Sequence, residues 1–84
     1  MTQTDNETEV ATAPADRIHA IVRGIAGQAV GDNDSFFDLG LDSIQLMQIC
    51  NEINDEYGEV IDLFLLFENP TVANCITIVE SAGV

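Results

Sequence analysis

The sequence contains no lysine and only two arginines, against 15 aspartate and glutamate residues, so its formal net charge is -13. Nucleic acids and anionic membranes are bound through protein cations, and this shortage argues against either as a partner. The chain is nevertheless too apolar, at 46% hydrophobic residues, for a purely acidic disordered tail. Its 84 residues allow one small hydrophobic core. The composition therefore predicts a single acidic folded domain whose natural partners are proteins with basic surfaces.

Long hydrophobic runs are missing as well. No run of about 18 apolar residues is present, and no cationic N-terminus leads into an apolar segment. These absences support neither a membrane span nor a signal peptide, so we expect a cytoplasmic protein. The only two cysteines, Cys50 and Cys75, lie among apolar residues at helical spacing. Without an export signal, this pattern predicts two reduced thiols in the core.

The chain divides into a tail and a domain. Residues 1–12 are mostly polar or acidic, which predicts a flexible acidic tail ahead of a domain over residues 13–84. Residues 13–16, with the sequence APAD, favour a helix start, because proline suits the first turn and aspartate the positive end of the helix dipole. The next apolar residues have the spacing of one buried helix face: Ile18, Ile21, Val22 and Ile25. Gly24 and Gly27 either weaken this helix or permit close packing.

Two further segments have the apolar spacing of helices. Residues 43–57 form the clearer one, with Asp42 or Ser43 available as a cap and Gly58 as a stop. Residues 72–79 repeat the pattern after a possible cap at Thr71. No sheet is needed to pair with these elements, so we expect an all-α fold, a small irregular helical bundle.

The segments between these helices are harder to interpret. Residues 30–42 have no sustained period and several turn formers, which predicts a long loop between the first and second helices. Loops of this length are usually packed by their own side chains, and four large apolar residues can anchor this one: Phe36, Phe37, Leu39 and Leu41. Residues 60–67 form a short apolar run whose length fits either a strand or a brief helix.

One short motif places a hydroxyl group where it can carry chemistry. In residues 38–44, DLGLDSI, Ser43 stands where a loop becomes the N-terminus of a strong helix, so its hydroxyl is exposed. A phosphate attached there would face unpaired backbone N–H groups and the positive end of the helix dipole, worth about 0.3–1 kcal/mol to an anion. The alternative is that Ser43 only caps the helix, because serine is a preferred cap.

Catalytic and metal-binding patterns are otherwise weak. A serine hydrolase needs a base near its nucleophile, but the only histidine is His19 on the first helix, where we expect a surface residue, and Ser43 lacks the G-x-S-x-G motif. A calcium loop starting at Asp32 would need glycine at its sixth position and glutamate at its twelfth, where this chain has Phe37 and Ser43. Two cysteines and one histidine without close spacing do not form a zinc site. We therefore expect neither catalysis nor a metal.

The motif DLGLDSI, followed by a helix and then by LFENPTV, resembles the acyl carrier proteins and peptidyl carrier domains. The resemblance covers residues 16–82 and implies a four-helix bundle with a short third helix at about residues 63–67. It also implies that Ser43 receives a 4′-phosphopantetheine arm from coenzyme A, added by a phosphopantetheinyl transferase. The terminal thiol of the arm then carries acyl groups as thioesters. By its position, Asp42 corresponds to the acidic residue that helps the transferase recognise the site.

The resemblance implies a noncatalytic acyl carrier protein that presents thioester intermediates to acyl-loading, condensing or tailoring enzymes. The wording DLGLDSI is closest to polyketide-type carriers, which favours polyketide or hybrid polyketide and nonribosomal peptide biosynthesis. An aminoacyl or peptidyl carrier of nonribosomal peptide synthesis is the near alternative. A noncovalent acidic helical interaction domain, using Ser43 only as a cap, is the alternative from another class. We expect a monomer, and a freestanding one because few residues precede the first helix; a domain excised from a larger synthase is the alternative.

Exposed apolar residues near Ser43 are candidate docking contacts. Ile44 and Met47 fall off the core stripe of the second helix beside Ser43, and partial burial against the loop is the alternative. Phe64 and Leu65 stand where the family often has polar residues, so they form either a partner patch or additional core. Fatty-acid carriers tend to be acidic early in the second helix, where this chain has glutamines, so partner recognition is expected to be more apolar.

Charge supports docking onto basic enzyme surfaces. The segment from Asp32 to Glu68 holds ten acidic residues and no lysine or arginine. We therefore expect its attraction for a basic partner to be free of competing cations within the chain. An ordinary solvated charged face is the alternative.

Overall fold

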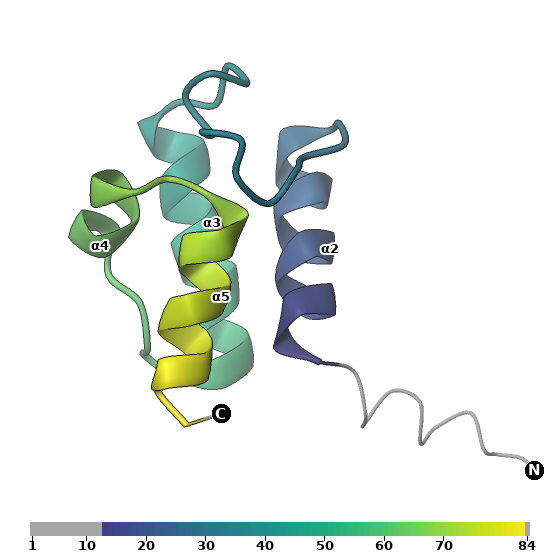
Figure 1. Ribbon diagram of the computed structural model, residues 1–84. Coiled ribbons are helices and arrows are strands. Elements are labelled where there is room, and N and C mark those ends of the chain that lie inside the picture. Colours follow the sequence, from purple (N-terminus) through teal and green to yellow (C-terminus); the bar gives the residue numbers. More distant parts are fainter. Residues whose placement is uncertain (1–12, 84) are drawn as a thin grey trace, which may run out of the picture.

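The structure is a computed structural model that describes residues 13–83. This part contains four helices and no strand, labelled as in Figure 1: α2 (Pro14–Ala26), α3 (Ser43–Tyr57), α4 (Leu63–Glu68) and α5 (Val72–Ser81). The all-α prediction is confirmed, and the ambiguous run at residues 60–67 resolves into the short helix α4. The tail predicted at residues 1–12 lies outside the described residues. None of the described helices is long and apolar enough to cross a membrane.

Helix α2 follows the sequence signals closely. Proline occupies its first turn, Asp16 lies near its N-terminus, and Ile18, Ile21 and Val22 are buried along one face. The helix ends at Gly27, whose φ of 72° is the left-handed conformation that favours glycine. This face lets α2 pack against both α3 and α5.

Gly24 lies on the exposed side of α2, and a Cβ there would meet nothing within 4 Å. Close packing at this position is therefore not its role. We expect Gly24→Ala to stabilise the protein by about 0.5–1 kcal/mol, because alanine loses less backbone entropy in a helix. Gly27→Ala is the matched control and should destabilise by about 1 kcal/mol, because the left-handed backbone disfavours a Cβ. Urea denaturation of both variants measures the difference, and equal stabilities would contradict the prediction.

The loop between α2 and α3 is anchored by two of its four large apolar residues. Phe36 and Leu41 are buried, and the backbone N–H of Leu41 donates to the carbonyl of Phe36 at 3.0 Å. The expectation was wrong for Phe37, which is 45% exposed, because the adjacent Phe36 takes the inward position and Phe37 turns outward. Leu39 is half-buried. The loop is therefore fixed to the body at few points.

Two backbone hydrogen bonds join this loop to the segment that begins α5. The N–H of Phe36 donates to the carbonyl of Pro70 at 2.8 Å, and the N–H of Ala73 donates to the carbonyl of Asp32 at 2.9 Å. Figure 1 shows the loop crossing from the upper end of α2 to the start of α3. The loop that leads into α3 is thereby bonded to the start of α5.

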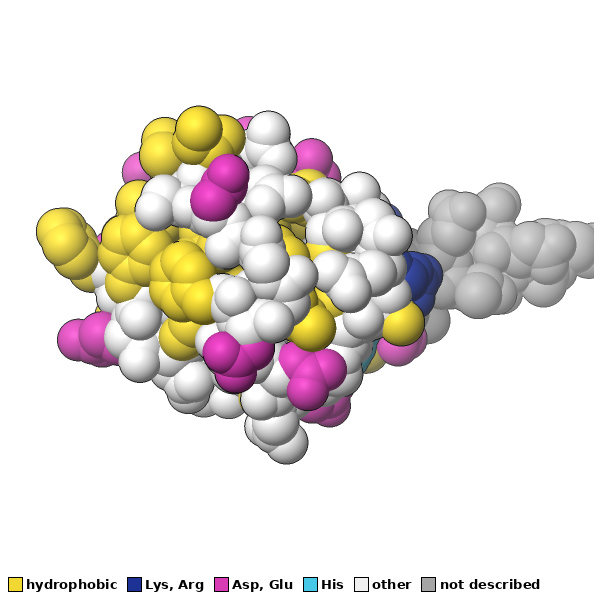
Figure 2. All heavy atoms as spheres, turned by 90° about the horizontal axis from the view of Figure 1, so that it is seen from above, with side chains coloured by type: hydrophobic (Ala, Val, Ile, Leu, Met, Phe, Trp, Pro, Cys, Tyr) yellow, Lys and Arg dark blue, Asp and Glu magenta, His cyan; other side chains and the backbone are white. Residues whose placement is uncertain are grey.

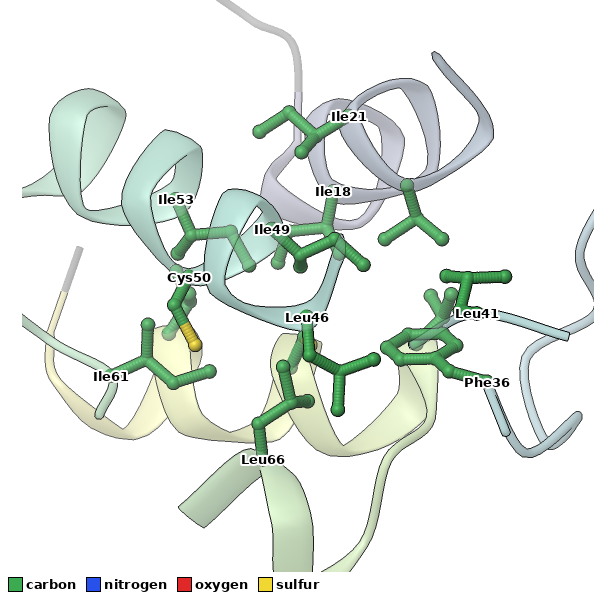
Figure 3. Close-up of a cluster of buried hydrophobic side chains, with 14 residues drawn as sticks. Ile18, Ile21, Phe36, Leu41, Leu46, Ile49, Cys50, Ile53, Ile61 and Leu66 are labelled. Atoms are coloured by element: carbon green, nitrogen blue, oxygen red, sulfur yellow. The ribbon is translucent and has the colours of Figure 1, made fainter. Parts of the chain in front are cut away.

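A single hydrophobic cluster fills the space between the helices. Phe36 of the loop and Leu66 of α4 point into the same cluster as Leu46 of α3 (Figure 3). The buried members come from every described helix, from the loop before α3 and from the segment between α3 and α4: Ile18, Ile21, Val22, Phe36, Leu41, Leu46, Ile49, Cys50, Ile53, Ile61, Leu66, Val72, Cys75 and Val79. The predicted stripes on α2, α3 and α5 therefore face one core, and both cysteines are free thiols within it, as expected.

Two asparagine side chains hold the short helix α4 in place. The Oδ1 atom of Asn54 on α3 accepts hydrogen bonds from the N–H groups of Val60 and Ile61, both at 3.0 Å. The Nδ2 group of Asn74 on α5 donates to the carbonyls of Leu65 at 3.0 Å and Asn69 at 2.9 Å. These bonds tie α4 and the segments on both sides of it to α3 and α5.

Candidate functional site

Ser43 is the first residue of α3, and its side chain is exposed. The cap before it is Asp42, which has an extended backbone and whose Oδ1 atom accepts a hydrogen bond from the N–H of Gln45 at 2.9 Å. The alternative that Ser43 serves only as the cap is therefore wrong. Because Asp42 performs that role, the hydroxyl of Ser43 is not needed to start the helix.

Asp42 and Gln45 each accept a hydrogen bond from the backbone N–H of the other. The Oε1 atom of Gln45 accepts a hydrogen bond from the N–H of Asp42 at 3.1 Å, which completes a capping box. In such a box two backbone donors at the helix start are satisfied by two side chains. The backbone on both sides of Ser43 is thus fixed.

The start of α3 leaves donors free for an anion. The N–H groups of Ser43 and Ile44 donate no hydrogen bond to any acceptor among residues 13–83. The first turn of α3 contains no acidic residue, and its cap is Asp42. An exposed hydroxyl, two free N–H groups and the positive end of the helix dipole together fit a phosphate ester on this serine.

The four predicted docking residues are all exposed. Ile44 on α3 is 66% exposed and Phe64 on α4 is 79% exposed, and Met47 and Leu65 are exposed as well. Deeper burial in the core, the alternative for Phe64 and Leu65, is therefore wrong, whereas Met47, at 48% exposed, is partly buried. Leu66 is the one buried residue of α4, which turns Phe64 and Leu65 toward solvent.

Sequence reasoning missed two further aromatic residues on this surface. The rings of Phe37, in the loop, and Phe67, on α4, stack with their centroids 6.0 Å apart, and both side chains are exposed. Figure 2 looks down on the end of the molecule where α3 begins, and hydrophobic side chains gather there in several groups with acidic side chains among them. The dark blue of arginine is confined to one edge of this view. The large apolar residues that are exposed within residues 13–83 are Phe37, Ile44, Met47, Phe64, Leu65 and Phe67.

Two acidic residues of the segment Asp32–Glu68 have partners on α2. Arg17 donates from Nη2 to Oε1 of Glu56 at 3.0 Å, and His19 contacts the carboxylate of Asp32. The expectation that this segment has no internal partners was therefore wrong for these two residues, because packing brings α2 against α3 and the loop. His19 is half-buried rather than fully at the surface. The acidic residues near Ser43 have no such cationic partner among the described residues.

A groove of about 450 Å³ lies between α3 and the segment that follows it. It exists because Asn54 bonds that segment back against α3, a contact that no helical periodicity predicts. Its lining combines apolar and polar side chains: Met47, Cys50, Asn51, Asn54, Glu59, Val60, Ile61, Asp62 and Leu63. Across residues 13–83, the structure contains no cluster of three or more potential metal ligands.

Burial makes both native thiols poor nucleophiles. Burial, together with the neighbouring thiol of Cys50, raises the pKa of Cys75 to about 12. Burial and the nearby Asp62 carboxylate raise the pKa of Cys50 as well. The thiolate is the reactive form of cysteine, and at pH 8 a thiol of pKa 12 is ionised in about one molecule in ten thousand.

We therefore expect the folded, unmodified chain to resist alkylation by iodoacetamide at pH 8, with Cys75 slower than Cys50. In denaturant both cysteines should react at the rate of a free thiol. Mass spectrometry of timed samples, with Cys50→Ala and Cys75→Ala to assign each thiol, measures the rates. Rapid alkylation of Cys75 in the folded protein would contradict the burial seen here.

The sequence of the chain matches the family model described as the phosphopantetheine attachment site, PP-binding, over residues 16–79. It is 33% identical to tyrocidine synthase 2 of Brevibacillus parabrevis over 75 residues, which cover 83% of this chain. It is 37% identical to surfactin synthase subunit 2 of Bacillus subtilis (strain 168) over 57 residues, which cover 68% of this chain. The chain spans about 2% of the length of each of these relatives.

The fold is also similar to a solved structure, described as the phosphopantetheine transferase Sfp in complex with coenzyme A and a peptidyl carrier protein. The TM-score is 0.76 at 24% identity, and the match covers 84% of this chain and 94% of that chain. The resemblance to the carrier proteins is thus confirmed. Because the family model spans most of the folded residues, the chain belongs to the phosphopantetheine attachment-site family and is a noncatalytic carrier domain that bears phosphopantetheine covalently.

Proposed function

We propose that Ser43 is the attachment residue and that the chain carries aminoacyl or peptidyl thioesters in nonribosomal peptide synthesis. The observation that carries the proposal is the exposed hydroxyl of Ser43 at the start of α3, beside two free backbone N–H groups. Those groups and the helix dipole favour the phosphodiester that links the arm to the serine.

The attached group supplies the chemistry of the carrier, because its thiol holds the cargo as a thioester. The chain itself supplies a fixed attachment point and a surface that partners recognise. Because the cargo is tethered to the carrier, its effective concentration at the active site of a docked enzyme is high. No catalytic group is needed on the domain for this role.

Names of relatives favour peptide over polyketide cargo. A further relative, besides tyrocidine synthase 2 and surfactin synthase subunit 2, is a protein named nonribosomal peptide synthetase 1, from Ajellomyces capsulatus. It is 47% identical over 45 residues, which cover 54% of this chain. Polyketide or hybrid synthesis is the second candidate. It is favoured by the wording DLGLDSI and by the neutral, partly apolar start of α3.

We assign partner docking to the exposed apolar residues near the attachment point. Ile44 and Met47 project from α3, and Phe64 and Leu65 from α4, which packs against α3. Acidic residues around these side chains suit partners with basic surfaces, among them the phosphopantetheinyl transferase, for which Asp42 is a recognition residue. The acidic surface also disfavours self-association, so the carrier acts as a monomer.

Two steps test the proposed function. Intact mass is first measured before and after incubation with coenzyme A, magnesium and a broad-specificity phosphopantetheinyl transferase. The modified protein is then offered amino acids with ATP and amino-acid-activating enzymes, or malonyl-coenzyme A with a malonyl transferase. Aminoacyl thioester formation supports peptide synthesis, whereas malonyl loading alone supports the polyketide candidate. No mass gain in folded, previously unmodified protein would support the noncovalent interaction domain instead.

A further inference from the structure

The capping box before α3 suggests a role for a residue that neither the sequence motif nor the proposed docking surface includes. Gln45 is bonded to Asp42 in both directions, through its backbone N–H at 2.9 Å and its side-chain Oε1 atom at 3.1 Å. Ser43 lies between these two residues in the chain. Its backbone therefore has little freedom while both bonds are present.

The chain reaches this box from a firmly held residue. Leu41 is buried, and its N–H is bonded to the carbonyl of Phe36 at 3.0 Å. Gly40, just before it, has a φ of 91°, which allows the sharp change of direction out of the loop. Asp42 is then the only residue between the anchored Leu41 and the first turn of α3. The backbone of Asp42 is fixed by its two hydrogen bonds with Gln45, each of which involves one side chain.

We propose that Gln45 is a positioning residue for the modification of Ser43, an inference that rests on the proposed function. Its side chain accepts a hydrogen bond from the N–H of Asp42, so the first turn of α3 stays formed and the Cα–Cβ bond of Ser43 keeps one direction toward an incoming transferase. Reaction rates depend strongly on such orientation of the reacting group. Gln45 acts through the backbone and does not contact the reacting atoms.

Glutamine and glutamate can both complete a capping box, whereas alanine cannot. Gln45→Ala should therefore lower kcat/KM for phosphopantetheine transfer about fivefold. Loss of one side-chain cap shifts the equilibrium constant between the formed and the frayed first turn of α3 by about that factor. Gln45→Glu should stay within about twofold of the parent, because its carboxylate still accepts from the N–H of Asp42. A normal rate for Gln45→Glu would show that the hydrogen bond to Asp42 matters, and not the absence of charge at residue 45.

Two controls separate positioning from other effects. Gln48, one turn further along α3, is an exposed amide whose side chain makes no hydrogen bond to the described residues, so Gln48→Ala should leave the transfer rate unchanged. Asn54→Ala removes three hydrogen bonds far along α3 and should lower stability without slowing transfer to the folded protein.

The assay measures initial rates of transfer from coenzyme A by a broad-specificity phosphopantetheinyl transferase, at temperatures where circular dichroism shows each variant folded. Equal rates for Gln45→Ala and the parent would overturn the inference. So would a Gln45→Glu variant as slow as Gln45→Ala, because the hydrogen bond would then not be the cause. If the parent itself gains no mass, the proposed function fails, which is a distinct outcome.

Discussion

Replacing Ser43 with alanine should abolish attachment of phosphopantetheine and leave the fold intact. Ser43 is exposed and makes no side-chain hydrogen bond to the described residues, and Asp42 is the residue that caps α3. Loss of the hydroxyl should therefore change the free energy of unfolding by no more than about 0.5 kcal/mol. Intact mass after incubation with coenzyme A and a transferase measures attachment, and thermal denaturation measures stability.

The chain offers two matched controls, because its other serines are Ser35 and Ser81. Ser35→Ala and Ser81→Ala should each gain one phosphopantetheinyl group, as the parent does. Attachment to the Ser43→Ala variant, or its loss in either control, would assign the group to a different serine. A large drop in stability of Ser43→Ala would instead show that the hydroxyl supports the helix.

Replacing Phe36 with alanine should have the largest effect on stability. Its side chain is 0% exposed, and it is the largest of the fully buried side chains. Removal of a buried phenylalanine ring costs about 3–5 kcal/mol, and small domains are stable by only about 5–15 kcal/mol. We therefore expect Phe36→Ala to be partly or fully unfolded at 37 °C, as measured by urea denaturation and circular dichroism.

The neighbouring Phe37 is a control of identical chemistry. It is 45% exposed and stacks on Phe67 at the surface, so Phe37→Ala should cost about 1 kcal/mol or less. Similar losses for Phe36→Ala and Phe37→Ala would contradict the inward and outward positions that the structure gives these two rings.

Helical periodicity predicted the core because each long helix buries one regular stripe. On α3 the predicted stripe ends with Tyr57, which is half-buried, and its other members are buried: Leu46, Ile49, Cys50 and Ile53. The same signal could not distinguish Phe36 from Phe37, since the loop has no period. Which ring turns inward depends on the hydrogen bond from the N–H of Phe36 to Pro70, 34 positions along the chain. Such long-range contacts leave no local pattern.

The candidate site was predictable to a similar degree. The motif placed Ser43 at a helix start, but it could not choose between Asp42 and Ser43 as the cap, because both residue types cap well. The choice follows from a geometry in which Asp42 exchanges bonds with Gln45. The pairing of Arg17 with Glu56 was equally hidden, because it joins two helices that are distant in sequence.

The loop before α3 is joined to the start of α5 through main-chain atoms, at Phe36 with Pro70 and at Ala73 with Asp32. Substitutions of exposed side chains leave such bonds in place unless proline replaces a donor. The outward side chains of this loop, such as Phe37 and Asp38, can therefore be exchanged without displacing Ser43. The partner preference of this carrier should for that reason be open to redesign by surface substitutions alone, with the attachment point kept in register by the backbone.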